Sequence, residues 1–118
     1  MPERPRYTVA HVGINNENSE EAYALLSVLC DLFNVEPNSD KPNTVFAGTI
    51  FEVMKHSRRG KHGHSALRTD DVEAAMADLA ARGITFQEDT IRRDESGKIR
   101  FVYLVQEFGG FAFHLTNE

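Results

Sequence analysis

The sequence of 118 residues predicts an α+β domain made of two β-α-β-β-β modules. A histidine-bearing motif occurs twice, and the residues after each copy follow first a helical period and then the period of strands. We expect the modules to form a curved mixed-sheet cup with the helices outside. We place module one at about residues 7–57 and module two at about 61–117, within a single domain spanning 1–118.

The repeat aligns His11–Ala22 with His64–Ala75, and each copy reads as a strand, a short polar turn and the start of a helix. In the first copy Asn18 and Glu21 have the spacing of a capping box. Apolar residues then recur at helical intervals, at Ala22, Leu25, Leu26, Leu29, Leu32 and Phe33. These signals predict a first helix that ends near Asn34, with Phe33 in the core.

The second copy predicts a helix that Thr69 or Asp70 caps and that Gly83 closes. Its apolar stripe consists of Val72, Met76 and Leu79. Three strands are expected after each helix: a short piece near Val35, then 44–47 and 49–55 in the first half, and 85–92, 99–106 and 111–116 in the second. Asp94–Gly97 supplies a hairpin turn in the second half.

Four residues in these strand-like segments are candidate metal ligands: His11, Glu52, His64 and His114. Each alternates with apolar or small residues, so the ligands would project from one face of a sheet while the apolar side chains form a core on the other. Three imidazoles and one carboxylate suit a divalent transition metal, either zinc or nickel, with manganese and iron as alternatives.

A simpler interpretation treats each histidine as a polar strand residue and Glu52 as an edge-strand charge facing solvent. Two histidines at equivalent positions of a repeat favour the metal site. Glu52 and His114 also occupy roughly equivalent last strands of the two halves. Two strand pairs would then each give one pair of ligands to a shared cup.

The composition limits the classes of partner. A formal net charge of −5 argues against general nucleic-acid binding, and no apolar run approaches the roughly 18 residues of a membrane span. The first five residues lack the apolar core of a signal peptide. The single cysteine, Cys30, cannot form an internal disulfide. We therefore expect a cytoplasmic protein with neither nucleic acid nor membrane as a partner.

Cationic side chains cluster between residues 55 and 64, in a chain that is acidic overall. This segment links the Glu52 strand to the His64 strand, so it would lie near the mouth of the cup. One interpretation is an anion clamp that binds substrate through Lys55, Arg58, Arg59 and Lys61. The alternatives are a solvated basic loop and adventitious metal binding through His56 and His62.

Two further residues are candidates for substrate binding. Arg68 shares strand parity with His64 and would face the cup, although pairing with Asp70 or Asp71 explains it equally well. Tyr103 would line the cavity and donate a hydrogen bond to substrate, or else serve as a partly buried strand tyrosine.

The duplicated modules and their motifs resemble the vicinal oxygen chelate superfamily, which includes glyoxalase I, methylmalonyl-CoA epimerase, extradiol dioxygenases and fosfomycin-resistance enzymes. The matching segments are Ala10–Ile14, Phe51–Val53, Gly63–Ala66 followed by Asp70–Val72, and Gly109–Leu115. The chain is also similar to the glyoxalase-like module found behind 2-keto-3-deoxy-phosphogluconate aldolases. Since it begins with methionine, we expect it to act as a free-standing relative of that module.

The resemblance implies a metal-dependent lyase or isomerase-type enzyme that acts on a small oxygen-rich acid or keto compound by bidentate oxygen chelation. It implies that Glu52 is a catalytic residue as well as a ligand, that the partner is a small anionic metabolite, and that the chain is a homodimer. Glyoxalase I and the epimerases usually carry glutamate where this chain has His114. That departure argues against glyoxalase I activity itself.

An alternative from another class is a non-catalytic metal- or ligand-binding regulatory module associated with sugar-acid aldolase metabolism. An extradiol-type Fe(II) oxygenase fits less well, because a fourth protein ligand would crowd its open positions. A drug-sequestering protein of the bleomycin-resistance kind has no need of the four ligands.

Overall fold

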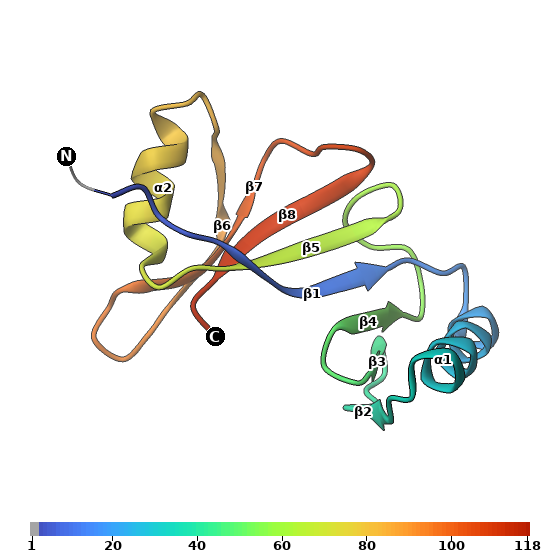
Figure 1. Cartoon of the computed structure of the whole chain (residues 1–118). Helices are drawn as coiled ribbons and strands as arrows, with labels where there is room; N and C mark the ends of the chain where they lie inside the picture. The colour runs from blue at the N-terminus through green and yellow to red at the C-terminus, as the bar shows by residue number, and fades with distance from the viewer. Residues whose placement is uncertain (1–2) are drawn as a thin grey trace.

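The computed structural model describes residues 3–118 and places two helices and eight strands along them (Figure 1). Met1 and Pro2, which belong to the segment considered for a signal peptide, lie outside the described residues. The elements are β1 (Thr8–Ile14), α1 (Ser19–Phe33), β2 (Pro37–Asn38), β3 (Thr44–Ala47), β4 (Phe51–Met54), β5 (Gly63–Arg68), α2 (Val72–Ala80), β6 (Phe86–Arg93), β7 (Ile99–Leu104) and β8 (Phe111–Thr116).

The strands form one mixed sheet in the order β2-β3-β4-β1-β5-β8-β7-β6. Read outward from its centre, one half runs β1, β4, β3, β2 and the other runs β5, β8, β7, β6. The halves meet where β1 pairs with β5 in antiparallel fashion, and each central strand pairs in parallel with the last strand of its own half. The predicted α+β class is confirmed. Figure 1 shows α1 and α2 at opposite ends of the molecule.

Each helix buries its apolar face against its own half of the sheet. The first core consists of Ala22, Leu26, Val45, Ala47 and Val53, with Cys30 packed against it. The second consists of Val72, Ala75, Val102, Leu104 and Leu115. Because the two cores are separate, the central strands carry the connection between the halves, and their other face is left free for a site.

The predicted N-cap is confirmed for α1 and is corrected by one residue for α2. Asn18 caps α1, since its Oδ1 accepts a hydrogen bond from the Glu21 N–H at 2.8 Å. For α2 the prediction of Thr69 or Asp70 is wrong, because Asp71 takes the extended cap conformation and accepts from the Ala74 N–H at 3.1 Å. Gly83 adopts a φ of 93° in the turn after α2, as the predicted helix closure requires.

The C-terminal end of α1 is exposed, although its apolar residues predicted that it would be buried. Leu32 and Phe33 are 66% and 58% exposed, so the interpretation of Phe33 as a core residue is wrong. A helix of 15 residues is about 22 Å long, whereas a strand of four residues spans about 13 Å. The short strands β3 and β4 therefore cannot cover the whole helix. Among residues 3–118, no helix is both long and apolar enough to cross a membrane.

Four predicted strands differ in their bounds. The strands expected at 85–92 and 99–106 form at Phe86–Arg93 and Ile99–Leu104. The piece expected near Val35 forms at Pro37–Asn38, where it pairs with β3. The strand expected over 49–55 is limited to Phe51–Met54, because Gly48, with a φ of 62°, lies in the turn that precedes it.

Replacing Asn18 with alanine is expected to lower the free energy of unfolding by about 1 kcal/mol, because the Glu21 N–H loses its acceptor. Asn18→Asp is the matched control, because aspartate keeps a side-chain acceptor for the Glu21 N–H and should cost little. Urea unfolding followed by far-ultraviolet circular dichroism measures both. Equal losses for the two variants would contradict the capping role.

Candidate metal centre

The candidate ligands come from the four central strands, one from each. His11 lies on β1, Glu52 on β4, His64 on β5 and His114 on β8. Strand register places Gly13 between Glu52 and His64 in one cross-strand row. In the next row, Ala66 lies between His11 and His114. Within each row, a small residue thus lies between two candidate ligands on neighbouring strands. This leaves room for the larger side chains on that face of the sheet.

The nitrogen and oxygen atoms of the candidate ligands lie close together. Nε2 of His64 lies 2.9 Å from Oε1 of Glu52, and Nε2 of His11 lies 3.4 Å from the same oxygen. The two Nε2 atoms are 3.3 Å apart. One ring nitrogen from each of His11, His64 and His114 lies within 4.8 Å of the others. The structure therefore brings together all four residues that the sequence singled out.

Gly13 makes the close approach of His64 possible. A β-carbon built on Gly13 would lie 2.0 Å from Cε1 of the His64 ring, well inside any allowed contact. The imidazole therefore occupies the space that a side chain at position 13 would need. Sequence reasoning missed this role, although a glycine inside a strand pattern is itself a signal of close approach.

The donor set fits a divalent transition metal. His64 and His114 are buried, at 5% and 3% exposure, on the same face as the partly buried His11 and Glu52. Nδ1 of His114 is buried with no hydrogen-bond partner among the described residues, which is costly for a polar nitrogen. Imidazoles and a carboxylate that converge in this way match the ligands of zinc and related metals. These four residues could hold such an ion.

Burial sets the protonation of the cluster. It lowers the pKa of His114 to about 3, with further lowering by His64 and His11, and it also lowers the pKa of His11. Burial alone would raise the pKa of Glu52, but the hydrogen bond from His64 and the charges of His64 and His11 outweigh it. The pKa of Glu52 therefore lies below its usual value. At neutral pH this favours neutral His11 and His114 beside an ionised carboxylate, the forms that bind metals.

The four candidate ligands line a cavity of about 540 Å³. Its other lining residues are Asn43, Thr44, Met54, Arg58, Arg59, Asp89, Thr90, Ile91, Arg92, Phe101 and Tyr103. Burial raises the pKa of Tyr103 to about 12, although Arg59 opposes the shift. The Tyr103 hydroxyl is therefore protonated at neutral pH and can donate a hydrogen bond. Arg92 and Phe101 were not singled out from the sequence.

Three predicted substrate-binding residues lie outside the lining of this cavity. The Lys55 ammonium donates to Asp40 at 2.7 Å, to the Tyr23 hydroxyl at 2.8 Å and to the Lys41 carbonyl at 2.7 Å. It therefore ties the segment between β2 and β3 to the end of β4. The Arg68 Nε–H donates to the backbone carbonyl of Glu118. Lys61 is exposed.

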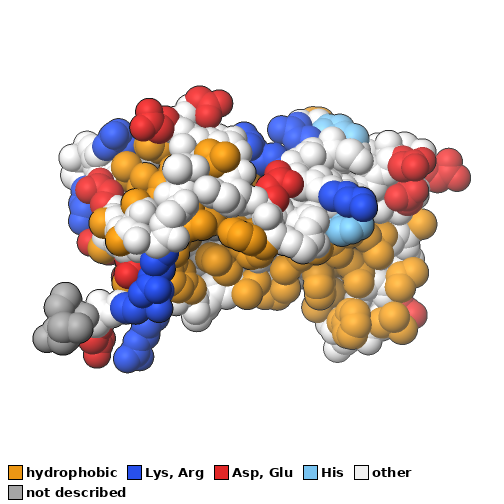
Figure 2. Space-filling model, turned by 90° about the horizontal axis from the view of Figure 1, so that it is seen from above, with side chains coloured by type: hydrophobic (Ala, Val, Ile, Leu, Met, Phe, Trp, Pro, Cys, Tyr) orange, Lys and Arg blue, Asp and Glu red, His pale blue; other side chains and the backbone are white. Residues whose placement is uncertain are grey.

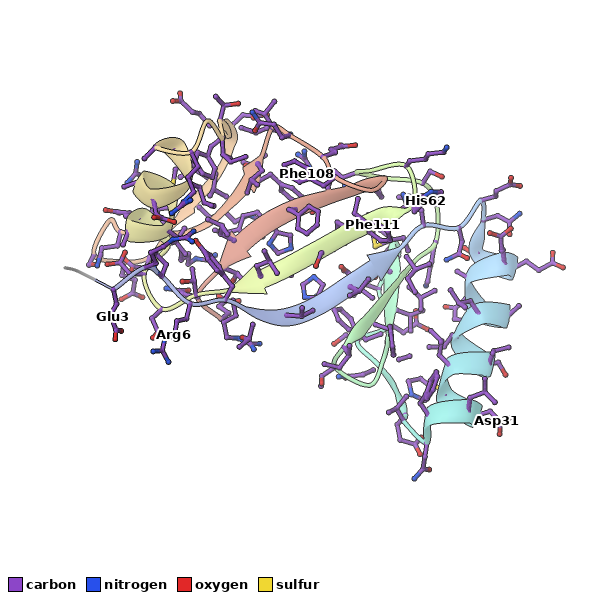
Figure 3. All side chains as sticks on the ribbon, turned by 45° about the horizontal axis from the view of Figure 1, so that its top comes forward. Glu3, Arg6, Asp31, His62, Phe108 and Phe111 are labelled. Atoms are coloured by element: carbon purple, nitrogen blue, oxygen red, sulfur yellow. The ribbon has the colours of Figure 1, made fainter. Side chains whose placement is uncertain are left out.

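The two histidines considered for adventitious metal binding have other neighbours. Nε2 of His56 lies 3.1 Å from Oδ1 of Asn43. The His62 ring lies beside Phe111, with 6.0 Å between ring centroids, near the start of β5 (Figure 3). Within residues 3–118, the group of three or more nearby metal-ligating side chains consists of His11, His64 and His114.

Solved structures of methylmalonyl-CoA epimerase share this architecture. A variant of the Streptomyces coelicolor enzyme in complex with 2-nitronate-propionyl-CoA has a TM-score of 0.57 and 18% identity, covering 91% of this chain and 94% of that chain. A methylmalonyl-CoA epimerase in complex with methylmalonyl-CoA and NH4+ has a TM-score of 0.58 and 18% identity, covering 96% and 94%. No protein-family model and no curated protein sequence matches the chain.

At this level of identity the likeness shows the fold. The chain shares the fold of methylmalonyl-CoA epimerase, which is a member of the vicinal oxygen chelate superfamily. The predicted resemblance to that superfamily is confirmed at the level of architecture.

Gly13→Ala is expected to lower the free energy of unfolding of the metal-free protein by roughly 1–3 kcal/mol, because the new methyl group meets the His64 ring. In a His64→Ala background the ring is absent, so the same substitution should cost much less. Urea unfolding of the four proteins in this double-mutant cycle measures the coupling. Equal costs in both backgrounds would contradict the close approach.

The metal-free protein is expected to lose stability as the pH falls from 6.5 to about 3. An unfolded histidine takes up a proton near pH 6.5, whereas buried His114 takes one up near pH 3. The unfolded state binds more protons in this window, so the stability present above pH 6.5 is lost at up to about 1.4 kcal/mol per pH unit. Urea midpoints across this range measure the slope. A His114→Leu variant should show a shallower dependence, and an identical slope would contradict the assignment.

Proposed function

We propose that this chain is a metal-dependent lyase or isomerase-type enzyme that acts on a small oxygen-rich acid or keto compound. The observation that carries the proposal is the convergence of three imidazoles and one carboxylate on one cavity. The fold of methylmalonyl-CoA epimerase supports the isomerase class. A divalent ion held there would bind two neighbouring substrate oxygens and, as a Lewis acid, stabilise negative charge that develops on them.

The side chains that line the cavity would bind the ion, transfer the proton and bind the substrate. His11, His64 and His114 would hold the ion as neutral ligands. Glu52 would be both a ligand and the base that takes a proton from the carbon next to the bound oxygens. Its lowered pKa keeps it ionised and able to accept that proton. The Tyr103 hydroxyl, protonated at neutral pH, would donate a hydrogen bond to a substrate oxygen.

His114 narrows the chemistry further. With imidazole at this position, Glu52 is the single carboxylate among the four converging residues. Proton removal and proton return would then both fall to Glu52, or the return would come from another donor in the cavity. This favours an isomerase or lyase that needs one carboxylate at the metal over one that needs two.

We also propose that the enzyme is a cytoplasmic homodimer that takes a small anionic metabolite, with no nucleic acid or membrane as partner. Large hydrophobic side chains are exposed, among them Val28, Leu32, Phe33 and Ile50. Figure 2 shows hydrophobic side chains spread over a broad area of one side of the molecule. Exposed apolar surface of this kind supports burial against a second subunit.

Untagged protein is expected to retain close to one divalent metal ion per chain, measured by elemental analysis after gel filtration. His64→Ala should lose the ion, because His64 contributes one of the converging nitrogens. His56→Ala is the control and should keep it, because His56 is paired with Asn43.

Turnover of keto acids, hydroxy acids and acyl thioesters by the loaded protein, absent in Glu52→Gln, would complete the case for an enzyme. A chain that cannot be loaded, or that loses metal with His56→Ala instead, contradicts the proposal. Metal retained without turnover of any such substrate would indicate the non-catalytic regulatory module associated with sugar-acid aldolase metabolism.

A further inference from the structure

Three of the described arginines line the cavity, and none of them is paired with a carboxylate in the part of the chain that the structure describes. Arg58 and Arg59 lie in the loop between β4 and β5, and Arg92 lies on β6. Among residues 3–118, none of the three has a carboxylate within 4 Å. The carboxylates of the cavity are Glu52, which contacts His11 and His64, and Asp89. The cavity wall therefore carries more positive charge than its own carboxylates neutralise.

Two of these guanidinium groups are each separated by one aromatic ring from His114, one of the candidate ligands. Cζ of Arg59 lies 4.2 Å from the Tyr103 ring centroid, and that ring lies 4.9 Å from the His114 ring. Cζ of Arg92 lies 5.3 Å from the Phe101 ring centroid, and that ring lies 4.5 Å from the His114 ring. The same arrangement thus occurs twice side by side, since Phe101 and Tyr103 are two residues apart on β7.

Neighbouring residues hold Arg59 in this position. Its guanidinium donates to Oε1 of Gln87 at 2.7 Å, and Gln87 lies opposite Tyr103 in the strand register. The Asn15 side chain donates to the carbonyl oxygens of Arg59 and Gly60 and accepts from the Arg58 N–H. The loop backbone is therefore fixed by the end of β1, and the cost of ordering it does not fall on ligand binding.

An irregularity in β6 positions Arg92. The register between β6 and β7 shifts between Gln87 and Arg92, so that Arg92 pairs with Phe101. The Thr90 hydroxyl oxygen accepts a hydrogen bond from the Tyr103 N–H across this irregularity. Bulges of this kind redirect side chains. As a result Arg92 comes from β6 to the same cavity that Arg59 reaches from the loop.

We propose that Arg59 and Arg92, with Arg58 beside them, form an anion subsite for a second charged group of the substrate. That group is a carboxylate or a phosphate, because guanidinium groups bind both through paired hydrogen bonds. It lies at the far end of a short carbon chain from the oxygens at the metal centre. The substrate class is then a dicarboxylic or phosphorylated keto or hydroxy acid. This last step rests on the proposed function, whereas the subsite itself does not.

Metal-free protein tests the arginines without the metal centre. Calorimetric titration with malonate and with inorganic phosphate is expected to show binding of at least one anion, weakened at least tenfold in Arg59→Gln and in Arg92→Gln. Arg93→Gln is the matched control, because the Arg93 guanidinium donates to the Gly97 carbonyl and does not line the cavity. Arg92→Lys should recover part of the affinity. Absence of binding, or equal binding by all variants, overturns the subsite.

Zinc-loaded protein tests the link to the metal centre and tells the two anions apart. Acetohydroxamate chelates a metal through two oxygens, succinohydroxamate adds a carboxylate, and phosphonoacetohydroxamate adds a phosphonate. One of the two charged chelators is expected to bind at least tenfold more tightly than acetohydroxamate, and to lose this advantage in Arg59→Gln and Arg92→Gln. The preferred tail identifies the anion.

No advantage for either charged tail overturns the substrate assignment. Failure to load zinc or any other divalent metal ion refutes the proposed function instead, and the metal-free titration then still decides whether the subsite binds anions. The two failures are therefore distinguishable.

Discussion

The convergence of the four candidate ligands depends on the free space above two small residues of the sheet, Gly13 and Ala66. Gly13 and Ala66 lie between the candidate ligands in successive cross-strand rows, and the His64 ring occupies the position that a side chain on Gly13 would fill. Neighbouring strands lie about 4.8 Å apart, and one ring nitrogen from each of His11, His64 and His114, on three neighbouring strands, lies within 4.8 Å of the others. The small residues between them leave the space for this convergence. The small size of the residues at positions 13 and 66 is therefore a precondition for the four side chains to bind one ion together.

Burial of the candidate ligands also determines which of these side chains are charged at neutral pH. His11 and His114 are kept neutral and Tyr103 is kept protonated because each would lose solvation on becoming charged. Glu52 stays ionised because imidazoles compensate its burial. The cavity wall therefore combines neutral His11 and His114 and ionised Glu52 with the guanidinium groups of Arg58, Arg59 and Arg92. This separation of charge would orient an anionic substrate before any bond to it forms.

The sequence predicted the parts of the site that follow from local periodicity. The duplication and the two-residue strand period singled out His11, Glu52, His64 and His114, and the structure brings them together. Long-range contacts were not predictable in this way. The side chain of Lys55 is taken up by Asp40, which is distant in sequence. The bulge near Ala10 and the irregularity that turns Arg92 toward the cavity depend on neighbouring strands and leave no local signature.

The antiparallel seam between β1 and β5 is where the two halves of the chain join. Each half has its own helix and core, and each contributes two of the four converging side chains. His11 and Glu52 come from the paired strands β1 and β4, and His64 and His114 come from the paired strands β5 and β8. Twisting about the seam would therefore change the separation between these two pairs more than the separation within either pair. The curvature of the whole sheet therefore sets the distance between the two pairs of side chains. An ion bound by all four would hold the two halves at one separation and so fix that curvature.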